Sequence, residues 1–309
     1  SFKSMGYDVH WFHDDGYPKD FDFTNCLFIG EGFADKNIPL NGSSCYLIMY
    51  CPSPDKYVGK VKRYIDIRMS AINFKDHIQE YSLDKDNTIK VGSSCYFEPS
   101  TNEKIHLKND YVDFSVPIKD FRVDYVIDDY DKIYISWATN LLPNEIDFEN
   151  MNLPRENNIY LCGNLSKMGV CENYSTYEPF INECQKHGIQ FHHNNSWQNP
   201  LSTEEVINRT QKSILGVDIR GPEHLRQNLI PCRVFKNISY GHLGLTNSEE
   251  IYNEMDGNCI YNSDTAQLFH DGMKEKENYD LIKKGMLYVK ENHTYINRIK
   301  SMIKIINND

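Results

Sequence analysis

Short apolar runs alternate with helix-like segments through the second half of the chain, and this alternation limits the fold more than any other feature. The segments between the runs carry helix signals, which are a Ser or Thr cap followed by acidic residues, or a glycine at the end. Strands that alternate with helices in this way form βαβ units and a parallel sheet. We therefore expect a doubly wound domain whose ligand crevice lies at the carboxyl ends of the strands. The apolar runs are residues 157–163, 189–193, 213–221, 243–247 and 258–263.

The first half of the chain is also mixed, but less regular. A polar segment with two prolines, residues 143–158, indicates a linker between two domains. We expect an α/β protein with two Rossmann-like domains facing a cleft, residues 1–150 and 151–309, and a C-terminal helical tail. Residues 1–12 look like the end of a helix leading into a strand, so we expect the first βα unit upstream, in a longer multidomain chain. The strand candidates are residues 7–12, 26–30, 45–51, 64–69 and 132–138, with a hairpin or edge region at 84–97.

Composition excludes several classes of protein. The formal net charge of -11, from 33 basic and 44 acidic residues, argues against general nucleic-acid binding, which needs broad positive surfaces. No apolar stretch approaches the roughly 18 residues of a membrane span, and no signal peptide is visible at the start. The nine cysteines include no C-x-x-C pair, which favours reduced thiols. We expect a cytoplasmic protein without a membrane span.

The stretch IPCRVFKNISYGHLGLTN, residues 230–247, stands out because it places two cations in a helix of an acidic protein. Arg233 and Lys236 lie on the first turns of this helix, directly after Pro231. A helix N-terminus offers free N–H groups and a positive dipole end, and a guanidinium adds a two-pronged anion clamp. We expect Arg233 to hold an anion such as a diphosphate, whereas a solvated helix position explains Lys236 equally well.

Further polar residues follow other strands of the same half and are expected at the same crevice edge. A glycine-rich turn after the first strand permits close approach to a phosphate, although it has no recognised phosphate-binding spacing. Polar side chains after the fourth strand suit ribose hydroxyls, although helix capping explains the serine equally well. The additional candidate donor-binding residues are Gly163, Lys167, Arg220, His224, Asn247 and Ser248.

The stretch RVFKNISYGHLGLTN resembles a pattern found in the C-terminal domain of B-type glycosyltransferases, including the group similar to spore-maturation proteins. Arg233, Phe235 and Gly241 match it, and the resemblance extends over about residues 157–273. Lys236 departs from the pattern, because the family usually has a glutamate there that contacts the ribose. The whole chain also looks like transferases of large DNA viruses. The same stretch is similar to fucosyltransferases that use GDP-fucose, in which a basic residue matching Arg233 contacts the diphosphate.

The resemblance implies a metal-independent transferase that uses no cofactor. It would move a sugar from a nucleotide-diphosphate donor, for which GDP-fucose is suggested, to an oligosaccharide or glycoprotein glycan. We expect inversion of configuration at the anomeric carbon, because Lys236 replaces the usual glutamate. If the protein is viral, it would act in the host cytoplasm. An inverting enzyme needs a general base that removes a proton from the attacking hydroxyl. Glu31 and Asp14, each near the end of a predicted strand in the first half, are the candidates, and ordinary turn acids are the alternative for both.

Three other functions remain open at this point. Asp129 and Asp131 form a D-x-D pair, which A-type glycosyltransferases use to hold a divalent metal, but here the pair precedes a strand instead of following one. We therefore predict no essential metal. A nucleotide-sugar epimerase needs a dinucleotide fingerprint or a Tyr-x-x-x-Lys pair on a helix, and neither is suitably placed. A non-catalytic glycan-binding domain would bind glycan without nucleotide.

Overall fold

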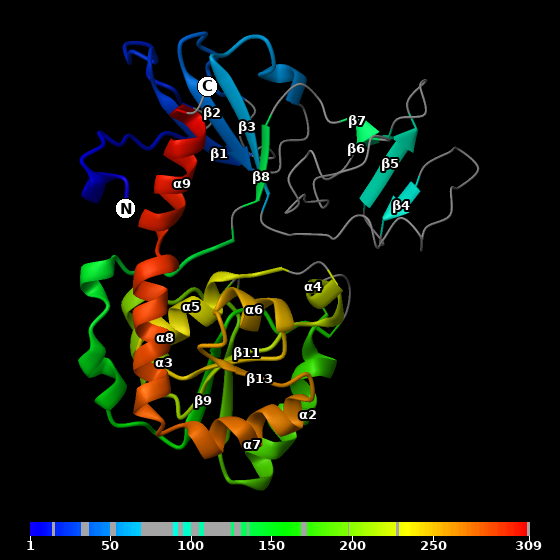
Figure 1. Cartoon of the computed structure of the whole chain (residues 1–309), viewed down its shortest axis with the longest axis vertical. Helices are drawn as coiled ribbons and strands as arrows, with labels where there is room; N and C mark the ends of the chain where they lie inside the picture. Colours follow the sequence, from blue (N-terminus) through cyan, green and yellow to red (C-terminus); the bar gives the residue numbers. More distant parts are fainter. Residues whose placement is uncertain are drawn as a thin grey trace. The chain divides into compact units, whose positions relative to one another are not determined.

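The computed structural model describes residues 1–13, 16–31, 37–49, 54–68, 89–91, 95–99, 105–107, 125–126, 131–134, 136–167, 172–196, 198–226 and 229–307. The chain divides into two compact units. The N-terminal unit comprises Phe2–Ser136 and Met302–Asp309, and the C-terminal unit comprises Trp137–Ser301 with Ser1. Figure 1 shows the strands and helices of each unit. The assignment of residues 1–150 to an acceptor and 151–309 to a nucleotide sugar stays a prediction.

A parallel sheet with the order β1-β2-β3-β8 forms the centre of the N-terminal unit. The strands predicted at 26–30, 45–51, 64–69 and 132–138 are confirmed at β1 (Leu27–Glu31), β2 (Cys45–Met49), β3 (Arg63–Arg68) and β8 (Asp131–Tyr134). A second sheet has the order β4-β5-β6-β7. Its antiparallel pair β4 and β5 confirms the hairpin predicted near 84–97. These four strands are β4 (Ile89–Val91), β5 (Cys95–Pro99), β6 (Ile105–Leu107) and β7 (Tyr125–Val126).

Aromatic rings build the core beside β2 and β3. The ring of Tyr46 stacks on Phe28 with centroids 4.4 Å apart, and Tyr57 stacks on Tyr64 at 5.1 Å. The strand predicted at residues 7–12 is wrong, since this segment has no strand structure and follows a short 3-10 helix, η1 (Lys3–Met5). Its rings pack against other rings instead, with His10 and Phe21 centroids 4.7 Å apart. An apolar–polar alternation therefore marked a ring cluster and not a sheet strand.

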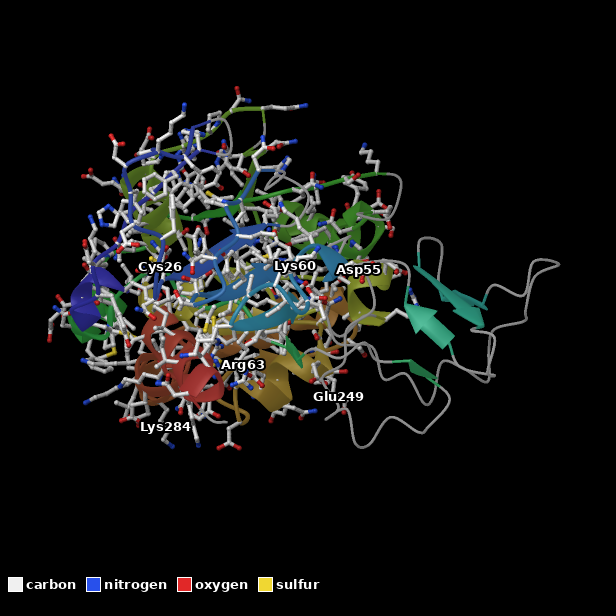
Figure 2. The ribbon with its side chains drawn as sticks, turned by 90° about the horizontal axis from the view of Figure 1, so that it is seen from above. Cys26, Asp55, Lys60, Arg63, Glu249 and Lys284 are labelled. Carbon is white, nitrogen blue, oxygen red and sulfur yellow. The ribbon has the colours of Figure 1, made fainter. Side chains whose placement is uncertain are left out.

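The last residues of the chain belong to the N-terminal unit. Helix α9 (Tyr295–Asn307) ends there, and Arg63 of β3, labelled in Figure 2, donates from Nη1 to the carbonyl oxygen of Ile306 at 3.1 Å. The final carbonyls of a helix have no partner within the helix, and a cation near them also interacts favourably with the helix dipole. Arg63 therefore caps the C-terminal end of α9.

The C-terminal unit contains the parallel strands that the sequence predicts. Strands β9 and β10 pair in parallel, as do β11, β12 and β13. The amide N–H of Ile214 donates to the carbonyl oxygen of Asn158 at 2.8 Å, so the chain entering β11 lies against β9. Strand pairing defines two sheets here, β10-β9 and β11-β12-β13. Because β11 contacts β9, the two sheets lie edge to edge in the order β10-β9-β11-β12-β13, and this order reverses between β9 and β11. The strands are β9 (Asn158–Cys162), β10 (Gln190–Asn194), β11 (Gly216–Asp218), β12 (Gly244–Thr246) and β13 (Ile260–Tyr261).

Helices connect and cover these strands (Figure 1). With right-handed crossovers, α2 lies on one face of the sheet, where it packs against α7, and α3 and α5 lie on the other, where α8 covers α5. Ser202 caps α3 in a capping box, since its hydroxyl accepts from the backbone N–H of Glu205 and the Glu205 carboxylate accepts from the backbone N–H of Ser202. The helices are α2 (Tyr174–Lys186), α3 (Thr203–Lys212), α4 (Pro222–Arg226), α5 (Cys232–Ser239), α6 (Glu249–Glu254), α7 (Thr265–Glu275) and α8 (Tyr279–Asn292).

The polar segment interpreted as a linker is instead part of the packed C-terminal unit. It forms two 3-10 helices, η5 (Pro143–Glu145) and η6 (Phe148–Asn152), and Ile146 between them is buried in the core. The polar residues cap these turns, as when the Asp147 carboxylate accepts from the amide of Glu149 at 3.0 Å. Sparse apolar anchors between capping residues therefore look like a linker in the sequence. Just before it, Thr139 and Asn140 bond to the end of α5, through Ser239 at 2.7 Å and Tyr240 at 2.5 Å.

Candidate functional site

The point where the strand order reverses, between β9 and β11, gathers charged and polar side chains at the carboxyl edge of the sheet. Ligands of doubly wound sheets bind in the crevice at such a reversal. Gly163 directly follows β9, Asp218 is the last residue of β11, and α5 brings Arg233 on its first turn. The sequence predicted that Gly163, Arg220 and Arg233 converge, and the structure brings these three together.

Arg233 is held along one edge of its guanidinium group. Its Nη1 donates to the hydroxyl oxygen of Tyr177 at 3.3 Å and lies 3.5 Å from Oδ1 of Asp218. Burial lowers the pKa of Arg233, but Tyr177 and Asp218 outweigh this effect and the net pKa is raised, so the group stays cationic. The side chain is 20% exposed. Arg233 is thus an anchored cation that still reaches solvent.

Gly163 makes room for the guanidinium of Arg233. A Cβ atom on Gly163 would collide with Nη2 of Arg233. The backbone of Gly163 is fixed from both sides, because its N–H donates to Asn194 at 3.0 Å and its carbonyl accepts from Nε2 of His193 at 2.8 Å. Since a carbonyl only accepts, this bond places a proton on Nε2 of His193.

Replacing Gly163 with Ala is therefore expected to displace Arg233. The affinity for inorganic pyrophosphate should fall about tenfold, close to the loss of one charge-assisted hydrogen bond, and calorimetric titration measures it. The control is the same change made in an Arg233→Ala background. There the added methyl has no guanidinium to displace, so it should leave the affinity unchanged. A similar loss in both backgrounds would contradict an effect through Arg233.

Arg220 and Asn247 lie deeper, and most of their polar groups already bond to other groups of the protein. Arg220 forms an ion pair with Asp218, and the two side chains are 7% and 0% exposed. Asn247 accepts from the amide of Arg220 at 2.7 Å and donates to its carbonyl at 3.0 Å. Both ends of the Asn247 amide are thus used to join the loops that follow β11 and β12. The hydroxyl of Ser248 accepts from the amide of Ile251 at 3.4 Å, which is the helix-capping role that the sequence allowed.

The remaining predicted donor-binding residues surround this centre less closely. His224 lies in α4, and its pKa is lowered by burial and by Arg220, so it is neutral at pH 7. Nζ of Lys167, an exposed residue, lies 4.3 Å from the centroid of the Tyr174 ring. Lys236 is half-buried on α5, three residues after Arg233. No described contact links Lys167 or Lys236 to the Arg233 centre, and their part in binding stays a prediction.

The catalytic candidates belong to the N-terminal unit. Glu31 is the exposed last residue of β1, at the carboxyl end of a parallel strand, as predicted. Asp14 and Asp129 lie outside the described residues, and Asp131 begins β8. Within the described ranges, no group of three or more His, Cys, Asp or Glu side chains is placed to hold a metal ion. In the same part of the chain, no helix is long and apolar enough to cross a membrane. The roles of Glu31 and Asp14 stay predictions.

Sequence reasoning missed three residues of the site. Asp218 gave a usable signal, because a carboxylate at the end of a buried apolar run, two positions before an arginine, is placed to pair with it. Tyr177 gave no local signal, since an aromatic residue inside an amphipathic helix is expected in the core. His193 gave no signal for its role, which is a hydrogen bond to the carbonyl oxygen of Gly163, 30 residues away in the sequence.

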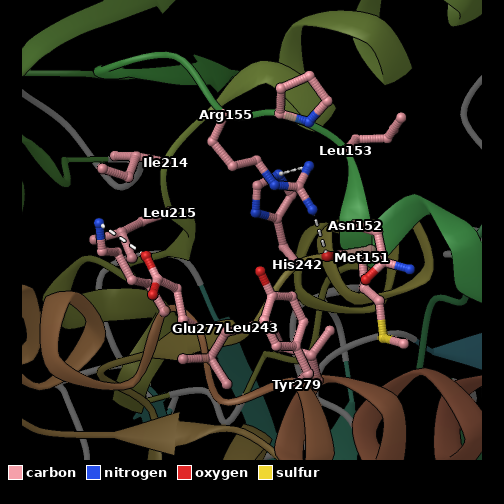
Figure 3. Close-up of a pocket in the computed structure, with 14 residues that line it drawn as sticks. Met151, Asn152, Leu153, Arg155, Ile214, Leu215, His242, Leu243, Glu277 and Tyr279 are labelled. Atoms are coloured by element: carbon pink, nitrogen blue, oxygen red, sulfur yellow. Dashed lines mark hydrogen bonds and ion pairs between the residues drawn. The ribbon is translucent and has the colours of Figure 1, made fainter.

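A cavity of about 310 Å³ lies at the opposite, amino-terminal edge of the same sheet (Figure 3). Arg155 is the central cation of this cavity, but its N–H groups already donate to backbone carbonyl oxygens of the protein. It donates to the carbonyl oxygens of Gln211, of Asn150 at 3.0 Å and of Gly241 at 2.7 Å. Gln211 and Gly241 lie at the C-terminal ends of α3 and α5, where carbonyls lack partners. Arg155 is therefore a structural residue.

Comparison with known proteins gave only distant structural similarity. No family model matches the sequence, and no curated protein matches it. Among solved structures, the chain is similar to a UDP-forming α,α-trehalose-phosphate synthase from Burkholderia xenovorans, with 8% identity over 87% of this chain and 75% of the other, at a TM-score of 0.48. The trehalose-6-phosphate synthase of Burkholderia multivorans gives 7% identity, 90% and 69% coverage and a TM-score of 0.45. The UDP-forming synthase of Burkholderia vietnamiensis gives 9% identity over 84% of this chain and 68% of the other, at a TM-score of 0.42. Similarity at this level assigns neither fold nor activity to the chain.

Proposed function

We propose that the chain is a glycosyltransferase that holds the diphosphate of a nucleotide sugar at the carboxyl edge of its C-terminal sheet. The observation that carries the proposal is the anchored guanidinium of Arg233. Tyr177 and Asp218 occupy its Nη1 edge, while its Nη2 edge lies over a glycine at the strand reversal. Two parallel N–H groups on one edge of an arginine match two oxygens of a phosphate.

In this reaction the bond between the sugar's anomeric carbon and the diphosphate oxygen breaks, and a bond to an acceptor hydroxyl oxygen forms. The diphosphate leaves with added negative charge, which donors already fixed in place stabilise best. Arg233 supplies such a donor, together with the N-terminal end of α5. The acceptor hydroxyl loses its proton to a base, for which Glu31 and Asp14 are the proposed residues.

The finer parts of the proposal come from the sequence. GDP-fucose as donor, inversion at the anomeric carbon, a glycan acceptor and independence of metal rest on the short likeness around Arg233. Thermal unfolding with GDP, UDP, ADP and dTDP, each with and without manganese, tests the base and the metal together. A ligand that binds the native state raises the melting temperature by mass action. Stabilisation that requires manganese would favour the A-type alternative with Asp129 and Asp131.

Changing Arg233 to Ala should weaken binding of the best nucleoside diphosphate by about 1.5–3 kcal/mol, the range for hydrogen bonds to charged groups. Titration calorimetry measures this loss. Lys274→Ala is the matched control, because it removes one positive charge from an 81% exposed side chain on α7. It should change the affinity by less than about 0.5 kcal/mol. Equal affinities for wild type and a folded Arg233→Ala variant would remove Arg233 from the site and the proposal with it.

A further inference from the structure

The charges at the strand reversal do not balance. Two guanidinium groups, those of Arg220 and Arg233, share the carboxylate of Asp218. His224 nearby is neutral at pH 7, because burial and the two arginines lower its pKa. The three charged groups therefore carry a net charge of one positive unit. An anion that binds here meets this sum and not the two full arginine charges.

The Asp218 carboxylate interacts more strongly with Arg220 than with Arg233. Oδ1 of Asp218 is in close contact with Nη2 of Arg220, and it lies 3.5 Å from Nη1 of Arg233, at the outer limit of a hydrogen bond. Oδ2 of Asp218 and Nε of Arg220 are buried without a hydrogen-bond partner among the described residues. Arg220 is thus the tightly paired cation, and Arg233 carries the excess charge toward solvent.

Access separates the roles of the three side chains. Asp218 is 0% and Arg220 7% exposed, while Arg233 is 20% exposed. A ligand can reach Arg233 without entering the core, whereas Asp218 is fully buried. Asp218 therefore acts on a ligand only through its charge and through the position of Arg233.

We propose that Asp218 is a counter-ion that competes with the bound diphosphate for Arg233 and so limits the affinity of the site for anions. The inference rests on the proposed function, since it assumes that the anion binds at Arg233. A transferase must release its nucleoside diphosphate product, and a site with two uncompensated arginines would hold it longer. Asp218 keeps the site positive enough to bind the diphosphate and weak enough to let it go.

Two possible roles of Asp218 differ in the sign of one measurement. If Asp218 only orients Arg233, removing its charge weakens anion binding. If it is a competing counter-ion, removing its charge leaves both guanidinium charges to the ligand, and binding becomes tighter. The gain should also grow with the charge of the ligand, which a purely structural change does not produce.

The first experiment compares wild type with Asp218→Asn, which preserves shape and an acceptor oxygen. Titration calorimetry with inorganic pyrophosphate and with sulfate measures both affinities. We expect at least tenfold tighter pyrophosphate binding, with a smaller gain for sulfate. Unchanged or weaker pyrophosphate binding by the folded variant overturns the counter-ion role, and so does an equal gain for both ions.

A second pair of variants decides the question if Asp218→Asn does not fold, because removing one partner of a buried ion pair is strongly destabilising. Arg220→Met leaves Asp218 to Arg233 alone, and the double variant Asp218→Asn with Arg220→Met removes both buried partners. We expect the double variant to bind pyrophosphate at least tenfold more tightly than Arg220→Met. Equal or weaker binding rejects the proposal. If wild type itself binds neither pyrophosphate nor any nucleoside diphosphate, the proposed function fails first, which separates the two failures.

Discussion

Lowering the pH from 7 to 5 is expected to reduce the free energy of unfolding by about 4 kcal/mol through two buried histidines. Burial, with a contribution from Arg155, lowers the pKa of His242 to about 3. Burial and Arg298 likewise lower the pKa of His293 to about 3. The unfolded chain regains the ordinary value of about 6.5, so below that pH it binds protons that the folded chain refuses. Stability is then lost as the pH falls below about 6.5, by roughly 1.4 kcal/mol per pH unit for each histidine.

The contacts of the two rings fix their neutral forms. Nε2 of His242 lies 2.5 Å from the carbonyl oxygen of Thr210, which only accepts, so the proton is on Nε2. Nδ1 of His293 accepts from Nη2 of Arg298 at 2.9 Å, and its ring stacks on Phe235 with centroids 4.3 Å apart. A second proton on either ring would be buried beside an arginine.

Urea unfolding at pH 7, 6 and 5 measures this effect, and His242→Gln is the control. The glutamine amide can still donate to Thr210, but it does not titrate. The variant should lose about 2 kcal/mol less than wild type between pH 7 and 5. Carboxylates such as Glu254, whose pKa burial raises, titrate in both proteins and cancel in the comparison. An identical pH dependence in the two proteins would show that His242 is protonated in the folded state.

Replacing Arg155 with Met is expected to cost about 3–5 kcal/mol of stability. The variant leaves three carbonyl oxygens without their donor, those of Asn150, Gln211 and Gly241, at about 1–3 kcal/mol for each one that water cannot reach. It also removes the cation at the C-terminal ends of α3 and α5. Urea unfolding at pH 7 measures the loss. A change below about 1 kcal/mol would mean that solvent replaces these bonds without penalty.

Arg155→Lys separates charge from hydrogen-bond geometry. An ammonium preserves the charge, but it cannot present the guanidinium's planar set of donors to three carbonyls. We expect a stability between those of wild type and Arg155→Met. The methionine variant also removes a charge that lowers the pKa of His242, so that pKa should rise toward its ordinary value.

The βαβ alternation of the second half could be predicted because each of its elements carries its own local signal. Ser202 and Glu205 are sufficient to predict the start of a helix, and the apolar run before Gly163 predicts a strand. The prediction of a strand at residues 7–12 was wrong because this segment packs its rings against rings outside it, such as Phe21, and does not join a sheet. The segment around Ile146 failed for the same reason, since its burial depends on partners that no local pattern reveals.

The candidate site was predictable only in part. Arg233 was visible because a cation at a helix start after a proline is locally unusual. The partners that give it a direction, Tyr177 and Asp218, come from two other elements, and only the fold brings them to it. Asn247 was correctly placed near the site, but its side chain is used by the backbone of Arg220, which a single sequence does not reveal.

Helix α5 has a mechanical consequence. Its 8 residues form a rod about 12 Å long. One end carries Arg233, and the other end, through Ser239 and Tyr240, is bonded to Thr139 and Asn140. Those two residues are among the first that the chain contributes to the C-terminal unit after Trp137. A tilt or slide of α5 at the Arg233 end therefore also moves Thr139 and Asn140. Binding of a ligand at Arg233 is thus mechanically linked to the segment through which the chain enters the C-terminal unit.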